Sequence, residues 1–78
     1  MNQSYEYQLG QRLRTLREAK RLTQEQLSAQ LQTRGCDVTR SALAKMEVGQ
    51  RHIYPDELFL LKVLLQVEFD DLFPMINE

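Results

Sequence analysis

Apolar residues in the first quarter of the chain recur three or four positions apart, the spacing of one face of an α-helix. The residues at these positions are Tyr5, Leu9, Leu13 and Leu16. Serine favours helix N-caps, so we expect this helix to begin at Ser4 and to end near Lys20 or Arg21. Gly10 weakens it by about 1 kcal/mol relative to alanine, which predicts close packing against a neighbour at that point.

Two segments further along, 22–27 and 38–43, carry the pattern of a helix start. In each, a threonine follows one apolar residue and precedes another by four positions. The threonine oxygen can accept a hydrogen bond from the first free N–H groups of a helix, and the apolar pair fixes the angle of entry. We therefore predict two short consecutive helices, one from Gln24 and one over 40–47, the second stopped by Gly49.

The last third of the chain predicts one longer helix and a short final turn. Pro55 fits the first position of a helix, where its missing N–H costs nothing. Behind it, one apolar stripe can close the core, and its members are Leu58, Leu61 and Leu65. A last turn over 70–73 precedes a second proline. No alternation typical of strands occurs, so the pattern predicts an all-α bundle of about five helices.

Composition predicts one small domain without a cofactor. The 78 residues, 42% of them apolar, are expected to form a single domain over 1–78, with a core over 5–73 and a frayed tail at 74–78. Cys36 is the only cysteine, which excludes an internal disulfide and a cysteine framework for a metal. The chain lacks the roughly 18 successive apolar residues of a membrane span and the pattern of a secretory signal. We expect a cytoplasmic protein.

The net charge of −1 hides a segregation of charge along the chain. From Leu9 to Arg51, nine basic residues stand against four acidic ones, whereas from His52 to Glu78 one basic residue stands against six acidic ones. A polyanion would be attracted by the first part and repelled by the second. The alternative is that acids and bases simply solvate different helices.

Arg17 and Glu47 are charged residues placed beside apolar stripes. Each follows a core candidate, Leu13 or Leu43, by four positions. A lone charge there would be expensive to desolvate, but a bidentate arginine–carboxylate pair is tolerable. We predict that they pair and join the first helix to the third. The alternative is that each side chain reaches solvent separately.

The predicted helix over 40–47 has the side chains of a DNA-reading element. With Leu43 and Met46 facing inward, its outer face carries Arg40, Ser41, Ala42 and Lys45. Arginine and lysine donate to guanine, serine serves several base edges, and an alanine methyl can contact thymine. As the second of two consecutive short helices, it is placed as a helix-turn-helix presents its reading helix. Taken alone, the same residues would also suit an ordinary solvated face.

Phosphate contacts are expected on either side of this reading helix. Thr23 and Gln24 combine side-chain groups with the free N–H groups and positive dipole end of their helix. Gln50, Arg51 and His52 lie in the loop beyond Gly49, where they could clamp a DNA backbone. Helix capping alone would also account for Thr23, and His52 could be a plain surface histidine.

Residues 17–27 and 39–51 together resemble the XRE family of Cro- and phage-repressor-like helix-turn-helix regulators. The resemblance extends over about residues 9 to 73. It implies a five-helix λ-repressor-like domain that binds operator DNA, usually as a dimer. It also implies that Gln24 contacts phosphate, that Arg40, Ser41 and Lys45 read bases, and that Arg17 pairs with Glu47.

Two departures from that family pattern change the expectation locally. Ser28 replaces the usual alanine, and residues 31–38 lengthen the connection between the second and third helices. We expect the second helix to gain a turn and end at Gly35, with Arg34 recruited as a further phosphate contact. Gln66 stands where a glycine often stops the fourth helix.

The segment 58–73 holds more apolar residues than one inward stripe uses, eleven of sixteen. Such an excess predicts an interface. The dimer-interface candidates are Phe59, Leu60, Val63, Leu64 and Phe69. The alternative is that the C-terminal turn folds back and covers Phe59 and Leu64.

The function predicted from these patterns is sequence-specific binding of double-stranded DNA by a homodimeric, repressor-like transcriptional regulator. The alternative is a helical protein-interaction module, or an antitoxin-like partner, that uses the apolar surface of the fourth helix. An enzyme is disfavoured because the acids fall on caps and solvent faces, and no nucleophile pair or phosphate-cradling glycine loop is present. We expect no cofactor, membrane or small-molecule ligand.

Overall fold

The computed structural model describes residues 3–73, which form five helices and no strand. The helices are α1 (Gln3–Ala19), α2 (Gln24–Thr33), α3 (Arg40–Glu47), α4 (Pro55–Leu65) and α5 (Phe69–Leu72). The predicted all-α class is confirmed. Two starts differ by one residue, since α1 already includes Ser4 and α5 begins before Asp70. The tail predicted at 74–78 lies outside the described residues.

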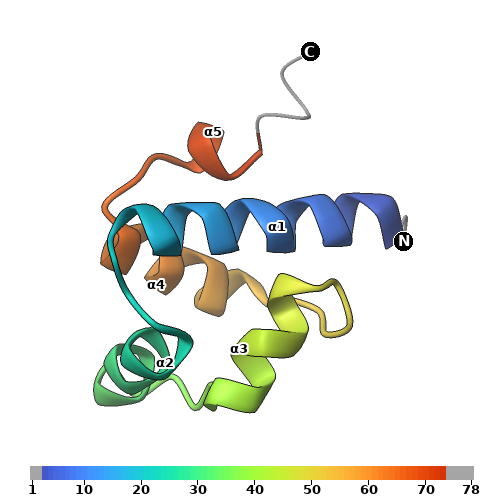
Figure 1. Cartoon of the computed structure of the whole chain (residues 1–78). Coiled ribbons are helices and arrows are strands. Elements are labelled where there is room, and N and C mark those ends of the chain that lie inside the picture. Colours follow the sequence, from blue (N-terminus) through green and yellow to red (C-terminus); the bar gives the residue numbers. More distant parts are fainter. Residues whose placement is uncertain (1–2, 74–78) are drawn as a thin grey trace.

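The helix α1 is the axis about which the others are arranged. In Figure 1 it crosses the molecule with α5 on one side and with α2 and α3 on the other. It packs against α3 and α5, while α2 packs against α3 and α4. The reading-helix candidate α3 is therefore held by two other helices and leaves its outer face free.

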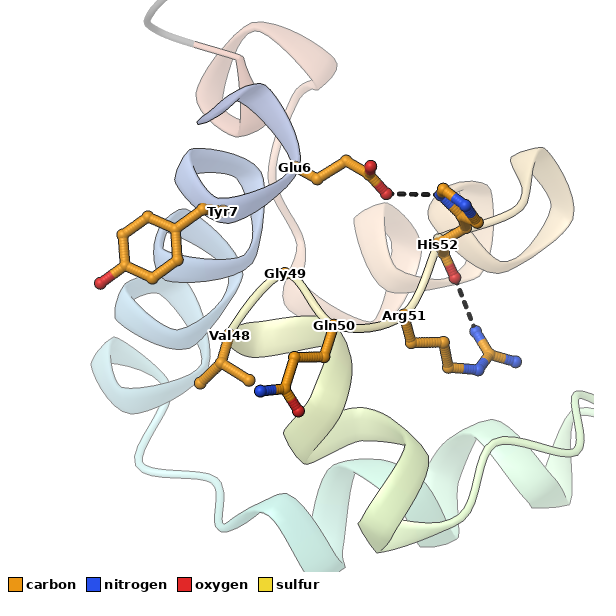
Figure 2. A pocket seen from close by; sticks show the side chains of 7 residues that line it. All are labelled: Glu6, Tyr7, Val48, Gly49, Gln50, Arg51 and His52. Atoms are coloured by element: carbon orange, nitrogen blue, oxygen red, sulfur yellow. Dashed lines mark hydrogen bonds and ion pairs between the residues drawn. The ribbon is translucent and has the colours of Figure 1, made fainter. Parts of the chain in front are cut away.

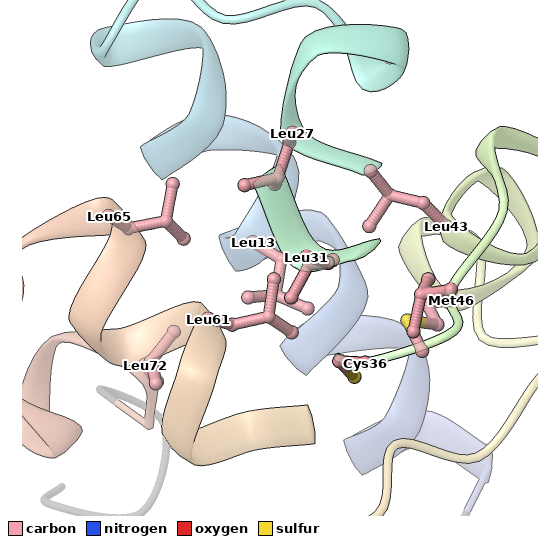
Figure 3. Packing of buried hydrophobic residues seen from close by; sticks show 10 residues of the cluster. Leu13, Leu27, Leu31, Cys36, Leu43, Met46, Leu61, Leu65 and Leu72 are labelled. Carbon is pink, nitrogen blue, oxygen red and sulfur yellow. The ribbon is translucent and has the colours of Figure 1, made fainter. Parts of the chain in front are cut away.

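Every helix contributes to one apolar core (Figure 3). Its buried members are Leu13, Leu27, Leu31, Cys36, Val38, Leu43, Met46, Leu61, Leu65 and Leu72. The lengthened connection 34–39 is anchored by this core, because Cys36 and Val38 are buried within it. Leu72 fastens α5 to the bundle, a role that the sequence pattern did not single out.

The two threonine starts form as the sequence predicts. Thr23 Oγ1 accepts from the Gln26 N–H at 3.0 Å, and Gln26 Oε1 accepts from the Thr23 N–H at 2.9 Å. Thr39 Oγ1 accepts from the Ala42 N–H at 3.1 Å. Each threonine satisfies a donor that lacks a partner inside its helix, so both helix starts are determined locally.

Four helices end in the same two-bond arrangement around a residue with positive φ. After α3, the Gly49 N–H donates to Met46 O and the Gln50 N–H donates to Lys45 O. The same pattern follows α1, α2 and α4, where the positive-φ residues are Arg21, Gly35 and Gln66. Gln66 thus takes the left-handed conformation that glycine adopts more easily, with φ 59°.

Gly10 allows α1 and α3 to approach closely, as its position predicted. A Cβ atom at Gly10 would lie 2.7 Å from the Glu47 carbonyl oxygen and closer still to that of Met46. Beside it, Gln11 Nε2 donates to the Glu47 carbonyl oxygen at 2.9 Å. The C-terminal end of α3 is therefore seated directly on α1.

Candidate nucleic-acid interface

The buried pair of Arg17 and Glu47 holds α3 in place. Arg17 Nε donates to Glu47 Oε2 at 2.7 Å, and Arg17 Nη2 donates to Glu47 Oε1 at 3.1 Å. The two side chains are only 9% and 2% exposed. The hydrogen bond to Glu47 raises the pKa of Arg17 above its ordinary value, against the opposing effect of burial. Arg17 Nη1 also donates to the Leu22 carbonyl oxygen at 2.7 Å, which ties the chain before α2 into the same cluster.

Gln24 belongs to this cluster. Its Nε2 donates to Glu47 Oε1 at 2.9 Å, and its side chain is half-buried. Glu47 thus accepts from residues of both α1 and α2 while it sits on α3. The sequence assigned Gln24 to phosphate and did not predict this contact, which couples the start of α2 to the last turn of α3.

The outer face of α3 carries three polar side chains that have no internal partner. Arg40, Ser41 and Lys45 are exposed, and their side chains make no hydrogen bond or ion pair with any residue of the part described here. The inward residues Leu43 and Met46 are fully buried, as predicted. Ala42 differs from the expectation. It is half-buried and packs against the core, so less of its methyl group is available to a base.

A depression of about 580 Å³ joins the start of α3 to the start of α2. Its lining comes from α1, α2 and α3 and consists of Arg14, Arg17, Thr23, Gln24, Glu25 and Arg40. The structure therefore brings the base-reading candidate Arg40 beside the phosphate candidates Thr23 and Gln24, residues far apart in the sequence. Three guanidinium groups line this depression against one carboxylate.

The loop after α3 is held by an ion pair of Arg51 with α4 and by a contact of His52 with α1, the second of which is drawn in Figure 2. Arg51 Nη1 and Nη2 each donate to a carboxylate oxygen of Glu57, both at 2.9 Å, and Nη1 also donates to the His52 carbonyl oxygen. His52 Nδ1 contacts Glu6 Oε2 of α1. Arg51 and His52 were expected to contact phosphate, but in the structure they hold the loop against α4 and α1. Of the three loop residues, Gln50 is the one whose side chain has no partner within residues 3–73.

Glu57 is a structural residue that sequence reasoning missed. Its side chain is 10% exposed, and the hydrogen bonds from Arg51 lower its pKa below the ordinary value. The sequence pattern did not single it out. Its place four residues before Leu61 was the available signal, because that spacing puts it on the buried side of α4.

Arg34 lies apart from the other phosphate candidates. It is exposed at the C-terminal end of α2 and lines a shallow depression together with Leu64 of α4. Thr23 and Gln24 are at the opposite end of the same ten-residue helix, about 15 Å away along its axis. The structure does not bring Arg34 together with them.

The apolar surface of α4 and α5 is only partly what the sequence predicted. Phe59, Val63 and Phe69 are 54%, 37% and 43% exposed. Leu60 and Leu64 are half-buried and pack against the core, which corrects their assignment to an open surface. Phe59 is not covered by the C-terminal turn, so the folded-back alternative is wrong for this residue.

The short helices α2 and α3 are joined by a turn, and a buried ion pair fixes the position of α3. The polar face of α3 stays free. This arrangement defines a helix-turn-helix protein. The chain belongs to the helix-turn-helix domain family, whose match covers residues 8–68. This family indicates DNA binding. Searches of curated proteins and of solved structures find no match. Over residues 3–73, no helix is both long and apolar enough to cross a membrane.

Proposed function

We propose that this protein binds double-stranded DNA sequence-specifically with α3 in the major groove, and that it regulates transcription. The observation that carries the proposal is the contrast between the buried and the outer face of α3. Its last turn is fixed by the buried pair of Arg17 and Glu47, while Arg40, Ser41 and Lys45 project from its outer face without partners. A reading helix needs this combination of a rigid seat and unengaged side chains.

Each free side chain has a role that its chemistry suits. Arg40 and Lys45 donate to guanine O6 and N7, and Ser41 reaches a donor or an acceptor on a base edge. Thr23 and Gln24 present the N-terminus of α2 to a neighbouring phosphate, where the helix dipole favours negative charge. Occupation of a site near a promoter excludes polymerase, so repression is the outcome that binding alone can produce.

We infer that the working form is a homodimer joined through Phe59, Val63 and Phe69. Phe59 and Val63 share one face of α4, and their burial together with Phe69 of α5 in a second copy would remove apolar surface from water. Two copies would read half-sites about 34–36 Å apart, one turn of the DNA helix.

Selection of bound duplexes from a random pool tests the proposed function. We expect enrichment of one motif, with two related half-sites if the dimer forms. The enriched duplex should bind more weakly as salt rises, because phosphate contacts release counterions. Enrichment of no motif would contradict sequence-specific binding.

A protein-interaction module is the second candidate, and the exposure of Phe59 and Val63 favours it. In that case α2 and α3 would serve only as scaffold. The two candidates differ in one variant, Arg40→Ala combined with Lys45→Ala. It should abolish operator binding under the first proposal and leave partner binding unchanged under the second.

A further inference from the structure

We propose that the depression at the start of α2 receives a phosphodiester of the DNA backbone and that Arg14 of α1 binds it. This inference rests on the proposed function and deepens it. It adds to the interface a residue that lies outside the two helices of the helix-turn-helix unit.

The position of Arg14 is the first support. Arg14 lines the same depression as Thr23, Gln24 and Arg40, so α1 supplies one wall and the starts of α2 and α3 supply the others. In the first turn of α2, Thr23 Oγ1 accepts from the Gln26 N–H, which leaves the N–H groups of Gln24 and Glu25 without an acceptor among residues 3–73. A phosphate in this space would meet guanidinium groups and a helix N-terminus together.

The availability of each arginine is the second support. Arg17 donates hydrogen bonds to the Glu47 carboxylate and to the Leu22 carbonyl oxygen, so its guanidinium is not free to bind a ligand. Arg40 has no partner within residues 3–73. Arg14 makes one contact, from Nε to Glu18 Oε2 at 3.3 Å, between side chains that are 53% and 56% exposed. Such an exposed pair is weak, and both Nη groups of Arg14 remain available to another anion.

The identity of the phosphate follows from Arg40. Because Arg40 belongs both to the depression and to the outer face of α3, an occupant of the depression lies beside the edge of the groove that α3 enters. A free phosphate ion has the same charge chemistry. The geometry favours the DNA backbone. Only a duplex can offer a phosphate in the depression and a base edge beside the outer face of α3 at the same time.

The experiment compares the wild-type chain with Arg14→Ala, Arg14→Lys and the charge-matched control Lys20→Ala. Fluorescence anisotropy gives the affinity for the selected duplex and for an unrelated one over about 50–200 mM salt. We expect Arg14→Ala to weaken binding to both duplexes by the same factor, about 5-fold to 20-fold, and to reduce the salt slope by about one. Arg14→Lys should recover part of the affinity, because lysine keeps the charge but loses the bidentate fork.

A single uncharged methylphosphonate, moved along the selected duplex, locates the contact. The wild-type chain should lose affinity at one phosphate near the reading helix, and Arg14→Ala should show no further loss there. Inorganic phosphate at matched ionic strength should compete no better than chloride. Specific competition by inorganic phosphate would overturn the assignment to DNA backbone.

The outcomes separate this inference from the proposed function. If Arg14→Ala keeps the wild-type affinity and salt slope while Arg40→Ala loses specificity, the inference is wrong and the proposed function stands. If the wild-type chain binds no duplex, both are wrong. Circular dichroism of Arg14→Ala should match that of the wild type, since Arg14 is exposed and its loss opens no cavity.

Discussion

Glu47 accepts two hydrogen bonds from Arg17 although its side chain lies almost wholly out of contact with solvent at the last turn of α3. The pair joins the first and third helices, and Gln24 adds a contact from the second. Because a carboxylate in this place needs every one of these donors, the orientation of α3 is set by the same residues that stabilise the bundle.

Removal of one member of this pair should be strongly destabilising. Arg17→Ala would leave the Glu47 carboxylate buried without its main partner, and we expect the free energy of unfolding to fall by about 3–5 kcal/mol in urea titrations. As the control, Glu18→Ala breaks the exposed pair with Arg14 and should cost less than about 1 kcal/mol. Equal losses for the two variants would contradict the structural role of Arg17.

The pair of Arg51 and Glu57 should make stability depend on pH. Hydrogen bonds from Arg51 lower the pKa of Glu57 from its ordinary value of 4.5. The folded state therefore binds this proton less readily than the unfolded state. The stabilisation is complete above pH 4.5 and is lost as the pH falls through the lower folded pKa. Glu57→Gln should be less stable than wild type by roughly 1–3 kcal/mol at neutral pH.

The difference between Glu57→Gln and wild type should then shrink as the pH is lowered from 4.5 through the folded pKa. Urea titrations of both proteins at a series of pH values measure it. A constant difference over that range would show that the Glu57 charge does not contribute.

Gln66→Gly should stabilise the protein. Gln66 ends α4 with φ 59°, a conformation that strains a side-chain-bearing residue and suits glycine. We expect a gain of about 1 kcal/mol, seen as a higher melting temperature. Gly35→Ala is the matched reverse test. A Cβ there would meet nothing within 4 Å, so the loss expected for φ 82° is purely conformational.

Phe59→Glu should separate the two copies of the proposed dimer without unfolding either. Phe59 is 54% exposed, so its replacement opens no cavity in the core. Sedimentation at micromolar concentration should show a dimer for wild type and a monomer for the variant. Monomeric wild type, with and without DNA, would remove the dimer proposal. Tyr5→Glu, at a similarly exposed aromatic residue on α1, serves as the control.

The features predicted correctly from the sequence are those determined within a few residues. Thr23 and Thr39 cap their helices through bonds to groups three residues ahead, so the starts of α2 and α3 could be placed without knowledge of the rest. The pair of Arg17 and Glu47 could also be inferred, because a charge on an apolar stripe requires a partner and few candidates exist.

The features that sequence reasoning missed depend on how distant segments meet. Gln24 and Arg51 were assigned to phosphate because both are polar and flank the reading helix. Whether each has an internal partner depends on the packing of α2 and α4 against the rest, which no local pattern specifies. Leu60 was assigned to the surface for a similar reason. It packs against the core, because the core covers more of α4 than one apolar stripe.

Under the proposed function the outer face of α3 reads DNA, and a specificity ratio tests this role most directly. Affinities of the wild-type chain and of the double variant Arg40→Ala, Lys45→Ala are measured at one salt concentration, on the selected duplex and on a scrambled one. Each lost base contact should cost the selected duplex about 1–3 kcal/mol, so the variant's preference should fall by at least about tenfold while its melting temperature stays unchanged. A double variant that keeps the wild-type preference would contradict the claim.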